Sequence, residues 1–391
     1  MVSEDSQVYR DPNLRIIFSI TLISVMGVAT IAPVFPVIAR ELGIPMESVG
    51  LLITVFTLPG IVLTPLMGIL ADRYGRKKVL LPSLLLYAVA GAACAFARDF
   101  QLLLILRFFQ GVGGASIGSI NVTLIGDLFQ GRRRTAAMGY NASVLSIGTA
   151  SYPSIGGALA LLGWFVPFFL PLAAIPVAIG VFFLLDPVKL ETRGKLSVYL
   201  GGVWKEMMRA EVLGLFVISL VTFILIFGPY LVFLPVILNT RFDATPLIIG
   251  LIMSCGSIST AITSARLEPL ARRFSERQLI RAAFFFYAAS FLAIPLLPTI
   301  WLFPLPVMLF GFAQGINYPG VLTLLAGLAP TNNRAAFMSA NGMVLRAGQT
   351  LGPVVTAGAF LWGGIEAVFQ LSAVLSLALF LTIPVFLKMG E

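Results

Sequence analysis

The chain has 391 residues, of which 58% are hydrophobic and 11% charged, with a net charge of +9 and no histidine. Soluble domains average about half apolar and about a quarter charged residues, so this balance indicates a membrane protein. The lack of histidine excludes a histidine proton relay or metal site. The sequence contains no nucleotide loop, metal-ligand cluster or nucleophile constellation, so we expect no enzyme activity, no cofactor and no metal.

Twelve apolar runs follow one another along the chain, each long enough to cross a hydrocarbon core about 30 Å thick. Backbone groups in lipid must satisfy one another, so runs of this length predict helices and an all-α membrane protein. The expected helices span residues 16–39, 48–71, 79–97, 101–126, 136–163, 165–185, 212–238, 246–265, 279–298, 301–328, 336–362 and 366–387. The polar first 14 residues do not resemble a removable signal peptide.

The longest interruption is the basic segment 187–211, which contains Trp204 and Met207 and is a candidate interfacial helix. It divides the chain into six predicted helices and six. We therefore predict an N-terminal six-helix bundle at 1–186, a cytoplasmic linker at 187–211 and a C-terminal six-helix bundle at 212–391.

The 26 lysines and arginines concentrate in alternate loops. When both termini are placed in the cytoplasm, only Arg40, Arg98 and Arg241 lie in outer loops, as the positive-inside rule requires. The net positive charge therefore follows from topology and does not indicate nucleic-acid binding. We expect a multi-pass protein of the cell membrane, with both termini cytoplasmic, the lipid bilayer as its surroundings and a monomer as its functional unit.

The two halves of the sequence match each other. RTAAMGYNASVLSIGTASYP, from Arg134, aligns with RAAFMSANGMVLRAGQTLGP, from Arg334, at an offset of 200 residues. The same offset lays LARRFSERQLI over LADRYGRKKVL. Two matches at one offset favour duplication, and paired six-helix repeats are a transporter architecture with a site between the halves. We therefore expect the two bundles to be related by a pseudo-twofold axis.

Five charges are crowded into the loop GILADRYGRKKVL, after the second apolar run. A positive-inside turn, with Gly75 permitting the bend, explains Arg73 and the two lysines that follow. It does not explain Asp72, because a carboxylate near the bilayer is costly unless it is paired. Asp127, at the end of the fourth helix, is a second such acid, and Arg76 can bridge the two. The alternatives are a charge clasp that rearranges when the halves move and a simple solvated turn.

The loop also resembles a family signature. GILADRYGRKK matches every fixed position of the signature loop of the major facilitator superfamily, LILRFFQGVGGA resembles its fourth-helix motif, and GTASYPSIGG resembles the fifth-helix motif of its drug/proton antiporter branch. Tyr152 replaces the second glycine of that last motif, and the first helix lacks the membrane acid common in that branch. The resemblance implies alternating access, proton antiport and a conformational role for Gly68, Asp72, Arg73, Gly75, Arg76, Asp127, Gly148, Pro153, Gly348, Gly352 and Pro353.

Polar side chains inside the predicted helices indicate a central cavity. Arg107, Gln110 and Asn121 share one face of the fourth helix with several glycines, so the alternatives are a cavity lining and a packing groove. By resemblance, the first, fourth, seventh and tenth helices line the cavity. The remaining candidates are Phe223, Phe227, Tyr230, Gln314, Asn317 and Tyr318, with packing as the alternative for the aromatic ones.

Arg346 is the most informative single residue of the interior. It lies twelve residues after Arg334, hence roughly 18 Å into the membrane, and Gln349 shares its face of the helix. An arginine near the midplane costs at least about 2.5 kcal/mol unless it meets water or a partner. Its alternatives are a structural role, bonded to backbone carbonyls, and contact with a substrate or coupling ion.

No acidic residue falls clearly at the midplane, which argues against a cavity built for cationic drugs. The leading hypothesis is a secondary transporter that exports a small amphiphile, with protons as a second partner and Asp72 and Asp127 as coupling candidates. The alternative is a carrier of organic anions or lipid-like amphiphiles that uses the intramembrane arginines. A non-transporting membrane receptor is a third, weaker alternative.

Overall fold

The computed structural model describes residues 8–185, 206–329 and 334–387, and every regular element in these ranges is a helix. Residues 187–205 of the predicted linker, with Trp204, lie outside the described residues, while Met207 is described and α9 begins within the predicted linker, at Ala210.

Six membrane crossings are formed by the first half of the chain. Their elements are α1 (Pro12–Ala29), η2 (Ala32–Val34), α2 (Phe35–Glu41), η3 (Met46–Gly50), α3 (Leu51–Tyr74), α4 (Arg76–Ala93), η4 (Cys94–Phe96), α5 (Phe100–Leu128), α6 (Gly131–Leu159), η5 (Val166–Ala173) and α7 (Ala174–Leu184). The second half contains α9 (Ala210–Leu225), the π-helix η6 (Ile226–Phe233), α10 (Leu234–Phe242), α11 (Pro246–Ala265), α12 (Leu267–Ala271), α13 (Glu276–Ala293), η7 (Ile294–Leu296), η8 (Ile300–Leu302), α14 (Pro304–Leu328) and α15 (Arg334–Phe386).

The described residues contain the twelve membrane-length helices that the sequence predicts. Ten helical segments are long and apolar enough to cross a membrane. One of them, residues 336–386, is two helices joined at Gly363 and Gly364, whose backbone angles are not helical. The twelfth membrane-length helix is α6, which is not among the ten apolar segments. It has 29 residues but is less apolar, because three arginines lie in its first turn and it carries many small polar side chains.

Single residues set where neighbouring helices end and begin. Gly75 separates α3 from α4 with φ +102°, a left-handed conformation that other residues rarely adopt. This conformation is the bend that the sequence predicts at Gly75. Asp99 precedes α5, and its carboxylate accepts a hydrogen bond from the amide of Leu102 at 2.9 Å, which satisfies one of the free donors at the start of that helix.

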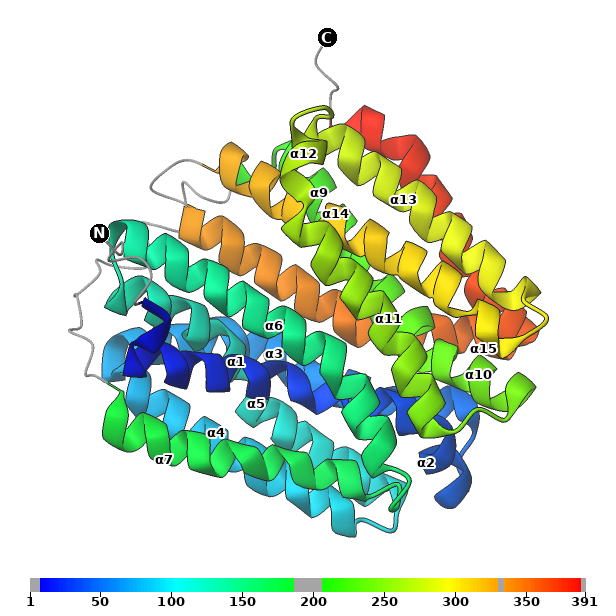
Figure 1. Ribbon diagram of the computed structural model, residues 1–391, viewed down its shortest axis with the longest axis horizontal. Coiled ribbons are helices and arrows are strands. Elements are labelled where there is room, and N and C mark those ends of the chain that lie inside the picture. The colour runs from blue at the N-terminus through cyan, green and yellow to red at the C-terminus, as the bar shows by residue number, and fades with distance from the viewer. Residues whose placement is uncertain (1–7, 186–205, 330–333, 388–391) are drawn as a thin grey trace.

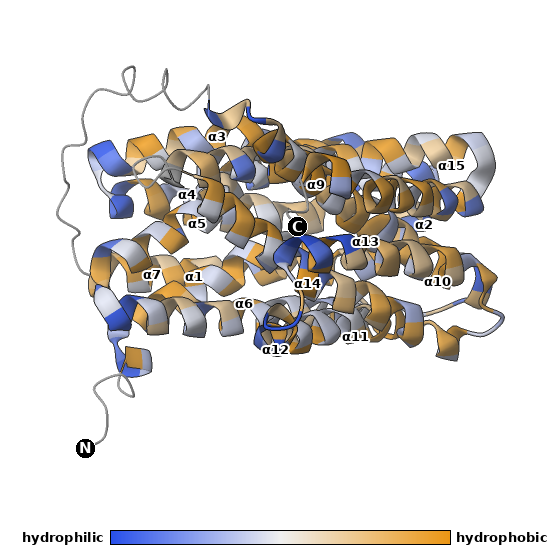
Figure 2. Cartoon of the chain, turned by 90° about the horizontal axis from the view of Figure 1, so that it is seen from above, coloured by the Kyte–Doolittle hydropathy of each residue, from blue (hydrophilic) through white to orange (hydrophobic). Residues whose placement is uncertain are grey.

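The helices of residues 12–184 pack against one another, and those of residues 210–386 form a second group (Figure 1). In the first group α5 packs against α3 and α4, while in the second α14 packs against α11 and α13. The groups meet along two seams, α6 with α11 and α3 with α15. Apolar residues run along the helices and hydrophilic residues gather near their ends (Figure 2), as expected for helices that cross a bilayer.

The seam between α6 and α11 is tight at one side of the molecule. We call the side where α3 ends and α4 begins the basic face, and the other side the opposite face. A Cβ atom on Gly157 of α6 would lie 2.2 Å from the carbonyl oxygen of Pro246. A Cβ atom on Gly250 of α11 would lie 2.2 Å from the carbonyl oxygen of Pro153. The two backbones therefore touch near the opposite face.

The seam between α3 and α15 extends from the opposite face toward the middle of the membrane. Gly50 packs against Pro353. One turn further, the hydroxyl of Thr54 donates to the carbonyl oxygen of Thr350 at 3.0 Å, and the hydroxyls of Thr57 and Thr350 lie 2.9 Å apart. Small polar side chains thus join the halves at this level.

The halves diverge beyond the level of Arg346. There, a Cβ atom on Gly60 of α3 would lie 3.1 Å from Cδ of Arg346. Toward the basic face, a Cβ atom on Gly68 of α3 or Gly342 of α15 would meet nothing within 4 Å, and Met343 is 40% exposed. The halves are therefore closed at the opposite face and separated toward the basic face.

Candidate functional site

The charged loop at the basic face forms a bridge between three helices. Arg76, the first residue of α4, pairs with Asp72 of α3 at 2.6 Å and with Asp127 of α5 at 2.9 Å. Its side chain is 10% exposed, and the ends of all three helices belong to the N-terminal half. The predicted bridge between the two acids is thus confirmed as geometry. Its role as a clasp that rearranges, and the roles of Asp72 and Asp127 in proton coupling, stay predictions.

The corresponding turn of the second half is built differently. Arg272, which aligns with Asp72, pairs with Glu268 at 2.7 Å, and the two side chains are 76% and 74% exposed. Glu276 stands where the first half has Arg76, so the signs of the charges are reversed. An exposed pair such as this one contributes little to stability. Arg277 of the same turn pairs with Glu211 of α9 at the longer distance of 3.8 Å.

Arg107 of α5 is buried inside the N-terminal half. Its guanidinium donates to the carbonyl oxygens of Leu52 and Gly27, at 3.2 and 3.0 Å, and to Oε1 of Gln110 at 2.7 Å. The ring of Phe56 lies 4.4 Å from the guanidinium carbon, within the range of a cation–π contact. The side chain is 1% exposed. In this conformation Arg107 therefore braces α1, α3 and α5 and does not line the space between the halves.

The predicted amides of the fourth and tenth helices are also internal. Asn121 donates to the hydroxyl of Thr21 on α1, and Asn317 donates to that of Thr222 on α9 at 2.7 Å. Gln110 and Asn317 are completely buried. The amide donors of Asn121 and Asn317 thus find partners on a neighbouring helix of their own half, while Gln110 accepts from Arg107 on its own helix. Nε2 of Gln110 and Oδ1 of Asn121 are buried with no hydrogen-bond partner among the described residues. Their position inside one half differs from the prediction, which placed these amides in the cavity lining.

One pair of hydrogen bonds repeats between the halves. Asn141 of α6 accepts from the hydroxyl of Thr21 on α1. Asn341 of α15, 200 residues later, accepts from the hydroxyl of Ser219 on α9 at 2.8 Å. Equivalent asparagines thus tie the fifth crossing to the first and the eleventh to the seventh, as duplication predicts.

Of the seven glycines and prolines expected to take part in conformational change, five lie where helices approach closely, while a Cβ atom on Gly68 or Gly75 would meet nothing within 4 Å. Gly148 packs against side chains of α1, and Gly348 and Gly352 pack against the backbone of α9. Pro153 and Pro353 lie on the two seams between the halves. The placement is equivalent in the two halves, and a role in movement stays a prediction.

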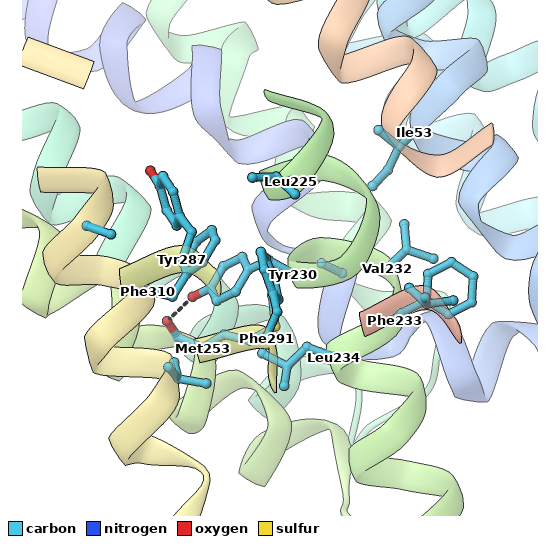
Figure 3. Close-up of a cluster of buried hydrophobic side chains, with 14 of the residues drawn as sticks. Ile53, Leu225, Tyr230, Val232, Phe233, Leu234, Met253, Tyr287, Phe291 and Phe310 are labelled. Atoms are coloured by element: carbon cyan, nitrogen blue, oxygen red, sulfur yellow. Dashed lines mark hydrogen bonds between the residues drawn. The ribbon is translucent and has the colours of Figure 1, made fainter. Parts of the chain in front are cut away.

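Tyr230 lies in the core of the C-terminal half (Figure 3). Its hydroxyl donates to the carbonyl oxygen of Met253 at 2.8 Å, and its ring stacks on that of Phe310 at 4.4 Å. The sequence places it on the face of Phe223 and Phe227 by assuming a regular α-helix. Residues 226–233 form a π-helix instead, whose wider turn rotates Tyr230 away from that face.

Arg346 of α15 stands at the seam between the halves. Nη1 donates to Oε1 of Gln349 at 3.1 Å, one turn along the same helix. Cβ atoms on Gly60 of α3 and Gly118 of α5 would lie 3.1 Å from its Cδ and 3.9 Å from its Nη2. The part-buried side chain thus extends from the C-terminal half over glycines of the N-terminal half.

Three part-buried aromatic rings lie beside this stretch of α15. Phe223 and Phe227 of α9 stack with their centroids 6.0 Å apart, and Tyr318 of α14 meets Phe223 edge-on at 5.9 Å. A Cβ atom on Gly348 would lie 2.8 Å from Cβ of Phe223, and Gly348 lies between Arg346 and Gln349 in the sequence. Phe223 therefore lies at about the level of Arg346 in the membrane, against another face of α15.

The predicted cavity residues thus fall into two sets. Those buried within one half are Arg107, Gln110, Asn121, Tyr230 and Asn317. Those that remain part-buried are Phe223, Phe227, Gln314, Tyr318, Arg346 and Gln349, and we call this second set the interface cluster. Gln314 lies one turn before Tyr318 and accepts a hydrogen bond from the hydroxyl of Tyr287.

Acidic residues of the described chain stand at helix ends. Asp11 and Asp99 precede α1 and α5, Glu211 and Glu276 lie in the first turns of α9 and α13, and Asp243 follows α10. Within the described ranges, no ion pair involves Arg107 or Arg346. The middle of the membrane is therefore positively charged in this part of the molecule.

Several contacts between the halves were not predicted from the sequence. Thr54, Thr57 and Thr350 join α3 to α15, and the hydroxyls of Ser154 and Ser254 lie 2.6 Å apart across the other seam. Single hydroxyls are common in membrane helices and bond to their own backbone, so they give little signal. The spacing of Thr54 and Thr57, followed by Gly60 on the same side of the helix, was the one usable indication.

Comparison with known proteins bears on this arrangement. The family description Major Facilitator Superfamily matches residues 17–301 and 215–390. The chain belongs to this superfamily. The family resemblance, the all-helical transporter fold and the expectation of a transporter and not an enzyme are thereby confirmed.

Curated relatives of this superfamily member include exporters. The bacillibactin exporter of Bacillus subtilis is 36% identical over 163 residues, 40% of each chain. Multidrug resistance protein 2 of Bacillus subtilis is 25% identical over 273 residues, 68% of each chain. The quinolone resistance protein NorA of Staphylococcus aureus is 30% identical over 182 residues, 45% of this chain and 46% of NorA. The matched part spans less than half the length of two of these three relatives.

Solved structures agree with the fold. The nucleoside transporter NupG has a TM-score of 0.78 and 14% identity, over 97% of this chain and 99% of NupG. The human organic anion transporter MFSD10 has a TM-score of 0.70 and 18% identity, over 97% of this chain and 100% of the other. At this identity the likeness establishes the fold alone.

Proposed function

We propose that this secondary transporter of the Major Facilitator Superfamily exports a small amphiphilic compound by alternating access. The observation that carries the proposal is the placement of the halves, which touch from the opposite face as far as Arg346 and separate toward the basic face. A transporter open to one side has this form. The relatives named as exporters of a siderophore, of drugs and of quinolones support export.

The basic face is the cytoplasmic face in this proposal, because positive charges gather there. Substrate enters from that side and reaches the interface cluster. The seams at the opposite face then open, while the basic ends of the two halves approach each other. Contacts between glycines and backbone carbonyls suit such a seam, since flat surfaces can separate without disentangling side chains.

Proton antiport is part of the proposal, with Asp72 and Asp127 as the coupling acids. Their support is position, since both carboxylates share Arg76 at the face that must rearrange. Protonation of either acid would weaken its bond to Arg76 and loosen the end of α3 or α5. The apolar helices long enough to cross a membrane and the membership of the superfamily support a place in the cell membrane.

The test is accumulation of fluorescent amphiphiles by bacteria that lack their main drug exporters and express this chain. The panel contains one cationic, one zwitterionic and one anionic aromatic compound. We expect cells that express the unaltered chain to accumulate less of at least one compound. Cells that express Gly157→Val should accumulate as much as cells without the protein, because the valine side chain would hold α6 and α11 apart. Accumulation unchanged for the whole panel, with the protein present in the membrane, would favour the receptor alternative.

A further inference from the structure

We propose that the interface cluster binds an aromatic anion, whose acidic group meets Arg346 and whose ring lies on Phe223, Phe227 and Tyr318. The inference rests on the transport function proposed above and names the substrate class for it. A compound of this class is an aromatic carboxylate, sulfonate or phenolate with an amphiphilic body.

The positive charge of Arg346 favours an anionic ligand. A guanidinium has five hydrogen-bond donors, and the described partner of Arg346 is the uncharged amide of Gln349. The described acids stand at helix ends, so none of them neutralises it. A carboxylate or sulfonate can accept two parallel hydrogen bonds from a guanidinium, and such bonds are strong where water is scarce. A cation would be repelled at the same place.

The aromatic rings lie where the body of the ligand would extend. Gly348 lies about 160° around α15 from Arg346, with Gln349 between the two faces. Phe223 packs against Gly348, and Phe227 and Tyr318 flank Phe223. An aromatic ligand can stack on or meet these rings edge-on. The cluster therefore offers one anionic subsite and one aromatic subsite.

The N-terminal half contributes to the anionic subsite through its glycines. A Cβ atom at Gly60 would lie 3.1 and 3.2 Å from Cδ and Nε of Arg346, so alanine would require the arginine side chain to shift by a few tenths of an ångström. Gly118 leaves similar room near Nη2. An anion held by Arg346 would therefore lie against both halves, and its binding would depend on their relative position.

Two probes with one ring skeleton test the charge requirement. Anilinonaphthalene sulfonate is anionic, and phenylnaphthylamine is the same skeleton without the sulfonate. Each is titrated against the purified full chain in an uncharged detergent, and affinity is read from the rise in the thermal midpoint with ligand concentration. We expect the sulfonate to bind at least tenfold more tightly than the neutral compound.

Variants then assign this preference to Arg346. Arg346→Gln should bring the two affinities within about twofold of each other, while Arg346→Lys should keep part of the preference because it keeps the charge. Arg281→Gln is the matched control: Arg281 also lies in a membrane helix, but it donates to the carbonyl oxygen of Phe380 and lies over that ring. Equal affinities in the unaltered protein, or a preference that survives Arg346→Gln, overturn the proposal.

A second pair of variants tests the glycine seat. Gly60→Ala should weaken sulfonate binding at least threefold and leave phenylnaphthylamine binding unchanged. Gly342→Ala, on α15 itself, should change neither, because a Cβ atom there meets nothing within 4 Å. Equal effects of the two alanines would contradict a role of Gly60 in positioning Arg346. Export of a cationic compound together with no sulfonate preference would leave the transport function standing and remove this inference alone.

Discussion

Arg107 and Arg346 are both arginines in the membrane interior, and their surroundings differ in every respect that decides a role. Arg107 is 1% exposed and is held by two backbone carbonyls, an amide oxygen and an aromatic ring, all within its own half. Arg346 is part-buried, has a single amide as its described partner and extends over glycines of the other half. Arg107 therefore has the contacts of a structural residue that holds helices together. Arg346 has the contacts of a group that is available to bind a ligand.

The difference shows that depth in the membrane does not by itself assign a function to a charged side chain. Carbonyls and an amide oxygen satisfy Nε and Nη1 of Arg107 without any ligand and hold several helices in one arrangement, while Nη2 is buried with no hydrogen-bond partner among the described residues. A charge at the seam between moving halves cannot rely on partners that stay in place. Position relative to the seam is therefore the more useful criterion.

Replacement of Arg107 should give the largest effect. Arg107→Ala removes hydrogen bonds to α1 and α3 and leaves Gln110 without its partner, so we expect a loss of about 2–4 kcal/mol in stability. The measurement is the thermal midpoint in detergent, with Arg346→Ala as the comparison. Equal loss of stability in the two variants would remove the distinction between brace and ligand group.

Two glycines of α5 sharpen the same contrast. A Cβ atom on Gly111 would lie 2.1 Å from the carbonyl oxygen of Phe56, whereas one on Gly118 would have its nearest neighbour, Nη2 of Arg346, at 3.9 Å. Gly111→Ala must push α3 away from α5 and should cost about 1–3 kcal/mol. Gly118→Ala should stay within about 0.5 kcal/mol. Thermal midpoints compare them, and similar values would place both glycines in the same packing environment.

The bridge at the basic face should respond less. Arg76→Gln breaks both ion pairs, while Asp72→Asn breaks one and leaves Asp127 paired, so the first should cost about 1 kcal/mol and the second less than half of that. The partial exposure of both acids keeps these values small. Thermal midpoints at low and high salt measure them. A larger loss from Asp72→Asn would show that Arg76 does not carry the bridge.

Tyr230→Phe should have the smallest effect. It removes the hydrogen bond to Met253 and keeps the ring stacked on Phe310, so we expect a loss of about 1 kcal/mol or less. Affinity for the aromatic probes should not change, because the ring lies in the core. A clear change in that affinity would return Tyr230 to the cavity lining.

The sequence predicted the helices and their pairing well, because length, apolar character and charge asymmetry act over whole segments. The bend at Gly75 and the bridge through Arg76 were also predictable, since a left-handed glycine and opposite charges have local signatures. Even the merged pair within α15 follows the predicted division at residues 362–366, where Gly363 and Gly364 leave helical geometry.

The interior was predicted less well, and for identifiable reasons. Whether Arg107 or Arg346 faces the seam depends on which carbonyls a neighbouring helix presents, and no pattern in one helix reports that. Tyr230 was misplaced because a π-helix changes the rotation per residue, and its sequence, IFGPYLVF, resembles any apolar run. Burial of Asn121 and Asn317 followed from partners on other helices.

The threonines at the seam have a further consequence for the energy of opening. Thr57 and Thr350 bond to each other, yet each hydroxyl also lies within hydrogen-bond range of a carbonyl four residues earlier in its own helix, Ile53 at 3.0 Å and Arg346 at 2.9 Å. When the seam parts, each hydroxyl keeps an acceptor and neither is stranded in hydrocarbon. The hydrogen bond between Thr57 and Thr350 can therefore break at low energetic penalty. A modest ligand-binding energy is then enough to decide between the closed and the open state of the seam.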